Sequence, residues 1–88
     1  MKIFDFSSAL EIIQEGGRVA RADWAESTFL FLVKGEAVIG AIEDCYGDAN
    51  AKGVHEATDA IYLHTKSGKL MPWFASNNDL LSSDWVKF

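Results

Sequence analysis

The stretch TFLFLV, residues 28–33, is β-branched and aromatic and has no alternation of polar with apolar side chains. A strand with this pattern is usually covered on both faces. The rest of the chain offers only one clear amphipathic helix to cover a sheet, so we expect the second cover to come from another copy of the chain. The sequence therefore predicts a buried strand here and a homo-oligomer, either a homodimer or a homotetramer.

One amphipathic helix is predicted before this strand, at about residues 7–16. Ser8 to Glu11 has the form of a capping box, in which a serine hydroxyl and a glutamate carboxylate satisfy free backbone amides at a helix start. Apolar residues at positions 9, 10, 12 and 13 form one helical face. Gly16 and Gly17 then supply a left-handed stop.

The remaining segments are apolar runs separated by polar residues and glycine. Residues 37–42 predict a strand or a buried connection, and residues 43–59 a long variable loop. Residues 60–65 and 69–74 predict a β-hairpin whose second strand lies at an edge because it contains Pro72. Residues 77–81 suit a capped turn of helix, and residues 85–88 a terminal strand. The predicted fold is one α+β domain, residues 1–88: a small antiparallel β-sheet with one N-terminal amphipathic helix and a short C-terminal helical turn.

The formal net charge of the chain is −5, from 13 acidic and 8 basic residues. This balance disfavours binding to nucleic-acid polymers or to an anionic membrane, although a small anion can still be gripped locally. The one cysteine, Cys45, cannot form an internal disulfide, and no apolar run approaches the roughly 18 residues of a membrane span. The N-terminal MKIFDF lacks the apolar segment of a signal peptide. We therefore expect a cytoplasmic protein.

Residues that could support catalysis or metal binding are few. The only histidines, His55 and His64, show no spacing typical of metal ligands, and no glycine loop has the form of a phosphate cradle. Cys45 with either histidine, or Asp79 with Asp84, could imitate a catalytic pair, but helix capping explains both carboxylates equally well. We expect no metal, no cofactor and no enzymatic activity.

The sequence neighbours of two tryptophans indicate a ligand site. Arginines precede Trp24, and a run of Ser, Asn and Asp follows Trp73. An indole stacks on a purine, a guanidinium matches a phosphate, and Asn or Asp binds ribose hydroxyls and base edges. Each tryptophan could equally belong to the core, and the arginines to a solvated strand edge. The candidate residues of a nucleotide-type site are Arg18, Arg21, Trp24, Trp73, Ser76, Asn78 and Asp79.

Several short motifs together resemble a known family. In order they are GGRVARADW (16–24), FLFLV (29–33), SGKLMPW (67–73), ASNND (75–79) and DW (84–85). This order is similar to the phage Thoeris anti-defence family of the second type. The resemblance covers nearly the whole chain outside residues 43–59, and the combination of R-x-x-W, P-W, S-x-x-D-L-L and D-W is specific.

The resemblance implies a sponge, that is, a protein that sequesters a signalling molecule without cleaving it, in the host bacterial cytoplasm. Members of the family look like small homo-oligomers, tetrameric where described, that bind a cyclic ADP-ribose isomer made by the Thoeris sensor and leave it intact. Some relatives also take cyclic dinucleotides. On this chain, Trp24 and Trp73 would stack on the ligand or wall its pocket, which would lie between protomers. The polar contacts to ribose, base or phosphate would come from Ser76, Asn78, Asp79, Arg18 and Arg21, while Asp84 and Trp85 could be structural.

Two other functions compete with this one. The same tryptophans could be interface anchors of a protein–protein interaction module, since tryptophan is a favoured hot-spot residue. A small nucleotide hydrolase is the third alternative. The ligand released after incubation distinguishes the three functions. Intact ligand supports the sponge, altered ligand the hydrolase, and no bound ligand the interaction module.

Overall fold

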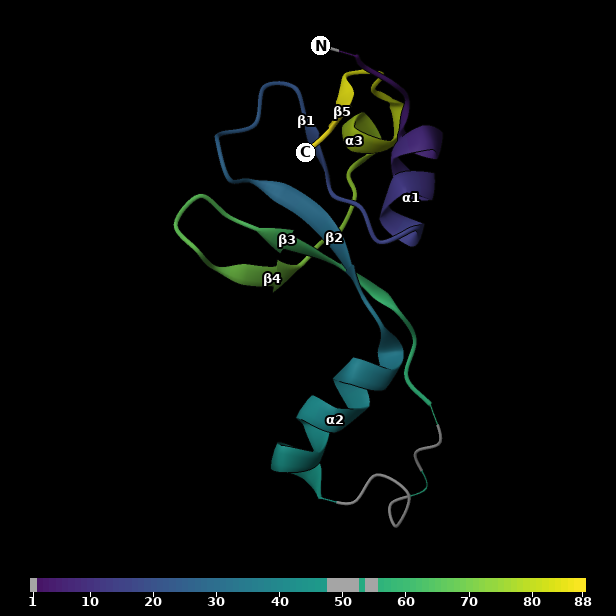
Figure 1. Cartoon of the computed structure of the whole chain (residues 1–88), viewed down its shortest axis with the longest axis vertical. Coiled ribbons are helices and arrows are strands. Elements are labelled where there is room, and N and C mark those ends of the chain that lie inside the picture. Colours follow the sequence, from purple (N-terminus) through teal and green to yellow (C-terminus); the bar gives the residue numbers. More distant parts are fainter. Residues whose placement is uncertain (1, 48–52, 54–55) are drawn as a thin grey trace.

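The computed structural model of the chain describes residues 2–47, 53 and 56–88 (Figure 1). It is an α+β fold, as predicted, with a helix in the middle of the chain that the sequence analysis did not foresee. In chain order the elements are α1 (Phe6–Gln14), β1 (Val19–Arg21), β2 (Phe29–Val33), α2 (Gly35–Tyr46), β3 (Ala60–His64), β4 (Leu70–Pro72), α3 (Asn77–Leu81) and β5 (Trp85–Lys87).

The five strands form one sheet in the order β4-β3-β2-β1-β5, and every neighbouring pair is antiparallel. The predicted apolar strand is β2, which lies in the middle of the sheet and pairs with β3 from Phe29↔His64 to Val33↔Ala60. The predicted hairpin is β3–β4. Its second strand is an edge strand, which is where Pro72 can be accommodated because proline donates no hydrogen bond to a ladder.

Helix α1 covers one face of the sheet, which we call the inner face. Ala9 and Ile13 of α1 are fully buried against Val19, Leu30 and Trp85 of three different strands. Their burial removes α1's apolar stripe from water, the main favourable term in a domain of this size. The short helix α3 contacts α1 on the same side of the molecule (Figure 1).

The start of α1 differs from the prediction. The N-cap is Asp5, whose carboxylate accepts a hydrogen bond from the backbone N–H of Ser8 at 2.9 Å, so the proposed capping box from Ser8 to Glu11 is wrong. Ser8 cannot cap because it already lies inside the helix, whereas an N-cap residue has extended backbone angles, as Asp5 does. The predicted stop is confirmed, because α1 ends at Gln14 and Gly16 has a φ of 92°.

The middle of the chain also corrects the prediction. Residues 37–42, expected as a strand or a buried connection, belong to the 12-residue helix α2. Val38, Ile39 and Ile42 fall at helical spacing, which a short apolar run does not separate from a strand. Since α2 continues to Tyr46, the predicted loop does not begin at residue 43. Within that loop, residues 48–52 and 54–55, His55 among them, lie outside the described residues.

The second face of the sheet, which we call the outer face, has no helix over it in the part of the chain that the structure describes. Side chains of β2 and β3 that alternate with the buried inner set point to it, including Phe29, Phe31, Tyr62 and His64. The expectation that β2 is covered on both faces is therefore met on one face by the chain itself. Cover of the other face by a second copy remains a prediction.

Candidate functional site

The three tryptophans form one aromatic cluster on the inner side of the sheet. Trp85 is fully buried at its centre, with Trp24 edge-on at 5.6 Å and Trp73 edge-on at 6.1 Å between ring centroids. Phe6 of α1 lies 5.3 Å from Trp85 and 6.0 Å from Trp73. Trp24 and Trp73 are half-buried and pack against the core, and Trp73 also lines a hollow described below.

Ser76 and Asp79 form a capping box at the start of α3. The Ser76 Oγ accepts the Asp79 N–H at 3.1 Å, and the Asp79 Oδ2 accepts the Ser76 N–H at 3.0 Å and its hydroxyl at 2.9 Å. This reciprocal pattern satisfies free amides that a five-residue helix could not otherwise pair. The capped helical turn predicted from the sequence is confirmed.

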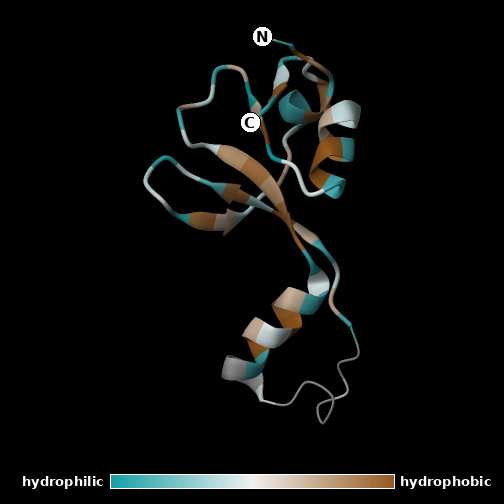
Figure 2. Ribbon diagram, viewed as in Figure 1, coloured by the Kyte–Doolittle hydropathy of each residue, from teal (hydrophilic) through white to brown (hydrophobic). Residues whose placement is uncertain are grey.

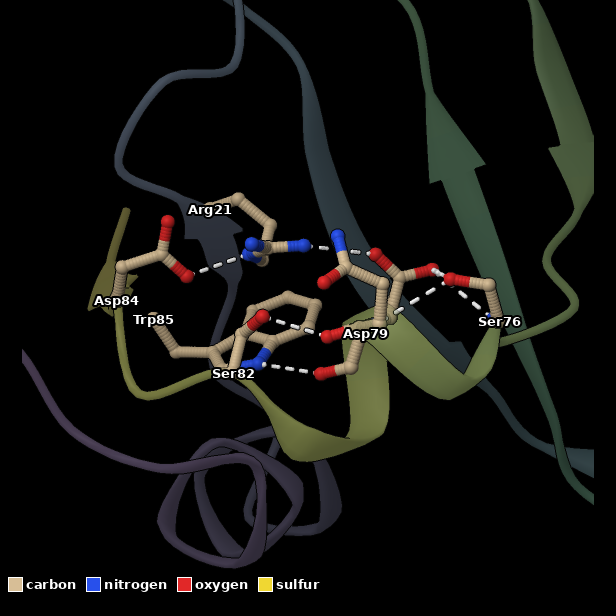
Figure 3. A network of polar contacts seen from close by, with 7 residues as sticks. Arg21, Ser76, Asp79, Ser82, Asp84 and Trp85 are labelled. Atoms are coloured by element: carbon tan, nitrogen blue, oxygen red, sulfur yellow. Dashed lines mark hydrogen bonds and ion pairs between the residues drawn. The ribbon is translucent and has the colours of Figure 1, made fainter.

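Arg21 joins this cap to the last strand, as Figure 3 shows. Its Nη1 donates to the Asp79 Oδ1 at 2.9 Å, and its Nε donates to the Asp84 Oδ1. The guanidinium carbon lies 5.7 Å from the centre of the Trp85 ring, and the Trp85 indole N–H donates to the Asp79 backbone oxygen at 3.1 Å. β1, α3 and β5 are therefore held together by one polar network.

The charges of this network reinforce one another. The hydrogen bond to Asp84 raises the pKa of Arg21 further above its ordinary value, against the opposing effect of burial. Burial acts to raise the pKa of Asp79, but hydrogen bonds from Ser76 and the Arg21 guanidinium outweigh it and hold that pKa below its usual range. Arg21 is thus a permanent cation held by two carboxylates, and its side chain is only 12% exposed.

An open hollow of about 570 Å³ lies beside Trp73, between α1 and α3. Its lining is mostly apolar and includes Phe6, Leu10, Ile61, Trp73, Phe74 and Leu80. The polar side chains of α3 begin at Ser76, three residues beyond Trp73. An apolar hollow with a few polar groups at its border is the usual form of a small-molecule site.

Residues 4–88 match the Tad2-like family, described as the Thoeris anti-defense 2-like domain. The chain belongs to this family. It is also 30% identical over 81 residues to Thoeris anti-defense 2 of Bacillus phage SP01, a match that covers 91% of this chain and 89% of that protein. The resemblance drawn from the sequence motifs is confirmed, and the matched range of this Tad2-like chain contains every candidate site residue.

The Tad2-like fold brings together most of the predicted site residues but not all of them. Asp79 binds both Arg21 and Ser76, and Trp24 and Trp73 flank the same buried Trp85. Asn78 is exposed on α3. Arg18 lies apart, on the outer face, with its guanidinium carbon 4.7 Å from the centre of the Phe29 ring.

The sequence analysis missed the apolar wall of the hollow. Phe6 and Leu10 of α1 are four residues apart and so lie on one side of the helix, facing Trp73 and Leu80. The predicted helix began at about residue 7 and so left out Phe6, while Leu10 was assigned only to the apolar face of a packing helix. For Asp84 the sequence left open a structural or a ligand-contacting role, and its ion pair with Arg21 is consistent with the structural one.

Other kinds of site find no support in the described part of this Tad2-like chain. Residues 2–47, 53 and 56–88 contain no group of three or more His, Cys, Asp or Glu side chains placed to hold a metal ion. None of the described helices is both long enough and apolar enough to cross a membrane. Cys45 is exposed on α2 and free.

Proposed function

We propose that this Tad2-like protein is a sponge, which binds a cyclic ADP-ribose-type immune signal and withholds it, unaltered, from the Thoeris effector. Cyclic dinucleotides are the second ligand class that the same site could take. The observation that carries the proposal is the apolar hollow at Trp73, whose lining includes Ala75 and Leu80, the chain neighbours of the capping residues Ser76 and Asp79. A nucleotide presents the same combination, a flat apolar base attached to a polar sugar.

Within this site each part of the ligand has a matching group. Trp73, which lines the hollow, would stack on a purine, and the half-buried Trp24, on the other edge of the Trp85 cluster, would provide a second aromatic contact. The ribose hydroxyls would bind to Ser76, Asn78 and Asp79, which lie in the chain next to the lining residues Ala75 and Leu80. For phosphate, Arg21 is the nearest guanidinium, whereas Arg18 could reach the ligand only from a neighbouring protomer, because it lies on the outer face.

The arrangement of acids and bases favours binding over catalysis. Asp79 and Asp84 are both ion-paired with Arg21, and the lowered pKa of Asp79 keeps it ionised, which makes it a poor proton donor. His64, a possible base, stacks on Phe29 of the outer face with 4.6 Å between ring centroids. A group that must give or take a proton at the reacting atom is therefore not provided near Trp73 by these residues.

We further propose that the protein acts as a homo-oligomer, a dimer or tetramer, with pockets between protomers. The hollow is open on one side, and Phe74 at its border is 86% exposed. A phenylalanine so placed is costly to leave in water and is suited to a protein contact. A second protomer that covered Phe74 would also close the hollow.

The test is to incubate the purified protein with cyclic ADP-ribose isomers, remove free ligand, denature the protein by heat, and identify what is released by mass spectrometry. We expect intact ligand in a fixed ratio to protein. Trp73→Ala should release much less, whereas Ile3→Ala, which removes an exposed apolar side chain away from the hollow, should release as much as the wild type. Altered ligand would identify an enzyme, and no ligand would favour a protein–protein interaction module.

A further inference from the structure

Two apolar surfaces of this chain have no partner among the described residues, and the outer face of the sheet is the first. Phe29 stacks on His64, with 4.6 Å between centroids, and contacts Phe31 and Phe88. Phe29, Phe31 and His64 line an open hollow of about 270 Å³ together with Arg18 and Leu70, and Leu70 is 60% exposed. Phe29 itself is only 8% exposed, but Phe31, Tyr62 and His64 of the same face are half-buried, and their exposed parts are suited to cover by another element.

Helix α2 is the second such surface. It projects beyond the sheet at the end of β2, at the other end of the molecule from α1 (Figure 1). Apolar residues recur along it (Figure 2), among them Val38, Ile39 and Ile42, the last 44% exposed. A helix of 12 residues is about 18 Å long, and most of the stability of such a helix comes from packing of its apolar side.

The two surfaces are kept apart within one chain by the junction at Gly35. The Gly35 N–H donates to the Asp59 carboxylate at 2.8 Å, and Lys34 pairs with the same carboxylate at 3.7 Å. A Cβ on Gly35 would lie 1.8 Å from the backbone oxygen of Ala57. α2 begins two residues after β2 ends, and these contacts hold its start in a direction that leads it beyond the sheet and away from the outer face (Figure 1).

The charges of the two surfaces are complementary. Arg18 stands on the outer face over Phe29, and no carboxylate of the described residues pairs with it. Helix α2 carries Glu36 in its first turn and Glu43 two turns later, both exposed. The apolar side of α2, flanked by glutamates, is therefore complementary to the aromatic outer face, which is flanked by Arg18.

We propose that α2 of one copy docks on the outer face of a second copy. The apolar residues of α2 would pack on the hollow between Phe31 and Leu70, and a glutamate of α2 would pair with Arg18. If the contact is reciprocal, each chain gives both its surfaces to one two-fold interface. A reciprocal contact buries twice the area of a single α2 contact, which brings the interface closer to the roughly 800 Å² per partner of stable complexes. Arg18 then serves the contact between copies rather than ligand phosphate.

This inference rests on the homo-oligomer of the proposed function, and charge reversal separates the two. Sedimentation would be compared for the wild type, Arg18→Glu, the double variant Glu36→Lys/Glu43→Lys, and all three changes together. We expect the dissociation constant to rise by at least about tenfold in the first two variants and to recover in the triple variant. Lys2→Glu, an equal charge change on the N-terminal segment, should leave it unchanged.

A second measurement does not depend on variants that could misfold. Cys45, the one cysteine of the chain, is exposed on α2 and can carry a photo-crosslinker. In a mixture of ¹⁴N and ¹⁵N chains, crosslinks between unlike chains should map to the outer face, around residues 60–72. A wild type that sediments as a monomer would overturn the oligomer itself. An oligomer that survives charge reversal, or crosslinks only elsewhere, would overturn this docking mode alone.

Discussion

Asp79→Ala is expected to lower the free energy of unfolding by about 2–3 kcal/mol. Loss of the capping carboxylate accounts for about 1 kcal/mol, the usual cost of removing a helix cap. Arg21 loses one of its two charged partners, and a hydrogen bond between charged groups is worth about 1.5–3 kcal/mol, reduced here because Asp84 remains. In a domain of this size the melting temperature should fall by about 10–20 °C.

Melting temperatures would be measured by circular dichroism at one protein concentration, because association of copies makes them concentration-dependent. Asp84→Ala is the matched control, since it also removes one carboxylate from Arg21 but leaves the capping box intact. Its effect should be smaller, because the Asp84 side chain is 36% exposed and that of Asp79 only 19%. A wild-type melting temperature for Asp79→Ala, or a larger loss for Asp84→Ala, would refute this account of the network.

The same variant separates a structural from a ligand-binding role for Asp79. Affinity for the cyclic ADP-ribose isomer would be measured by calorimetry at a temperature where Asp79→Ala is still folded. If the carboxylate binds ribose hydroxyls, we expect affinity to fall by about 1–3 kcal/mol in addition to the stability loss. Normal affinity in the folded variant would show that Asp79 serves only the cap and Arg21.

Three further outcomes can be measured. The pKa of Asp79 is lower in the folded than in the unfolded chain, so the ionised carboxylate stabilises the fold fully above its ordinary pKa of 3.8. This stabilisation is lost as the pH falls through the folded value. The urea midpoints of Asp79→Asn should therefore fall less steeply with acid than those of the wild type. Trp73→Ala should weaken ligand binding by about 1–3 kcal/mol in calorimetry, the value of one stacked base. Gly35→Ala should cost about 1–3 kcal/mol in urea unfolding, because its Cβ would meet the Ala57 backbone, whereas Gly40→Ala, with nothing within 4 Å, should gain about 0.5–1 kcal/mol.

The sheet could be predicted from the sequence because its signals are local. The apolar run of Phe29–Val33 and the glycine turn before β4 each determine their own structure, whatever the rest of the chain does. Helix α2 could not be predicted in the same way. Its apolar residues fit a buried strand as well as a helix, and Gly35 and Gly40 both lower its helix propensity. What fixes its start is Asp59, 24 residues away from the Gly35 amide that it binds.

The candidate site was predictable only where it is contiguous in the chain. Ser76 and Asp79 are three residues apart, and their spacing alone predicts the cap. The pairing of Arg21 with Asp79 spans 58 residues and depends on the sheet bringing β1 beside α3 and β5. Arg18 was grouped with Arg21 because they are close in sequence. Arg18 directly precedes β1 and Arg21 ends it, and residues three apart in extended backbone point to opposite faces, so that alternation could have separated them.

The charge balance around Arg21 constrains how a phosphate could bind in the proposed sponge. One guanidinium between two carboxylates leaves the network with an excess of one negative charge, so an anionic ligand is repelled unless Arg21 changes partner. Asp84 is the partner more easily exchanged, because it is the more exposed and no other side-chain bond holds its carboxylate among the described residues, whereas Asp79 is also bound to Ser76. We therefore expect the ligand phosphate to take the place of Asp84 at the Arg21 Nε while the cap of α3 stays intact. A liganded structure in which Arg21 still binds Asp84 would contradict this exchange and leave the phosphate to other donors.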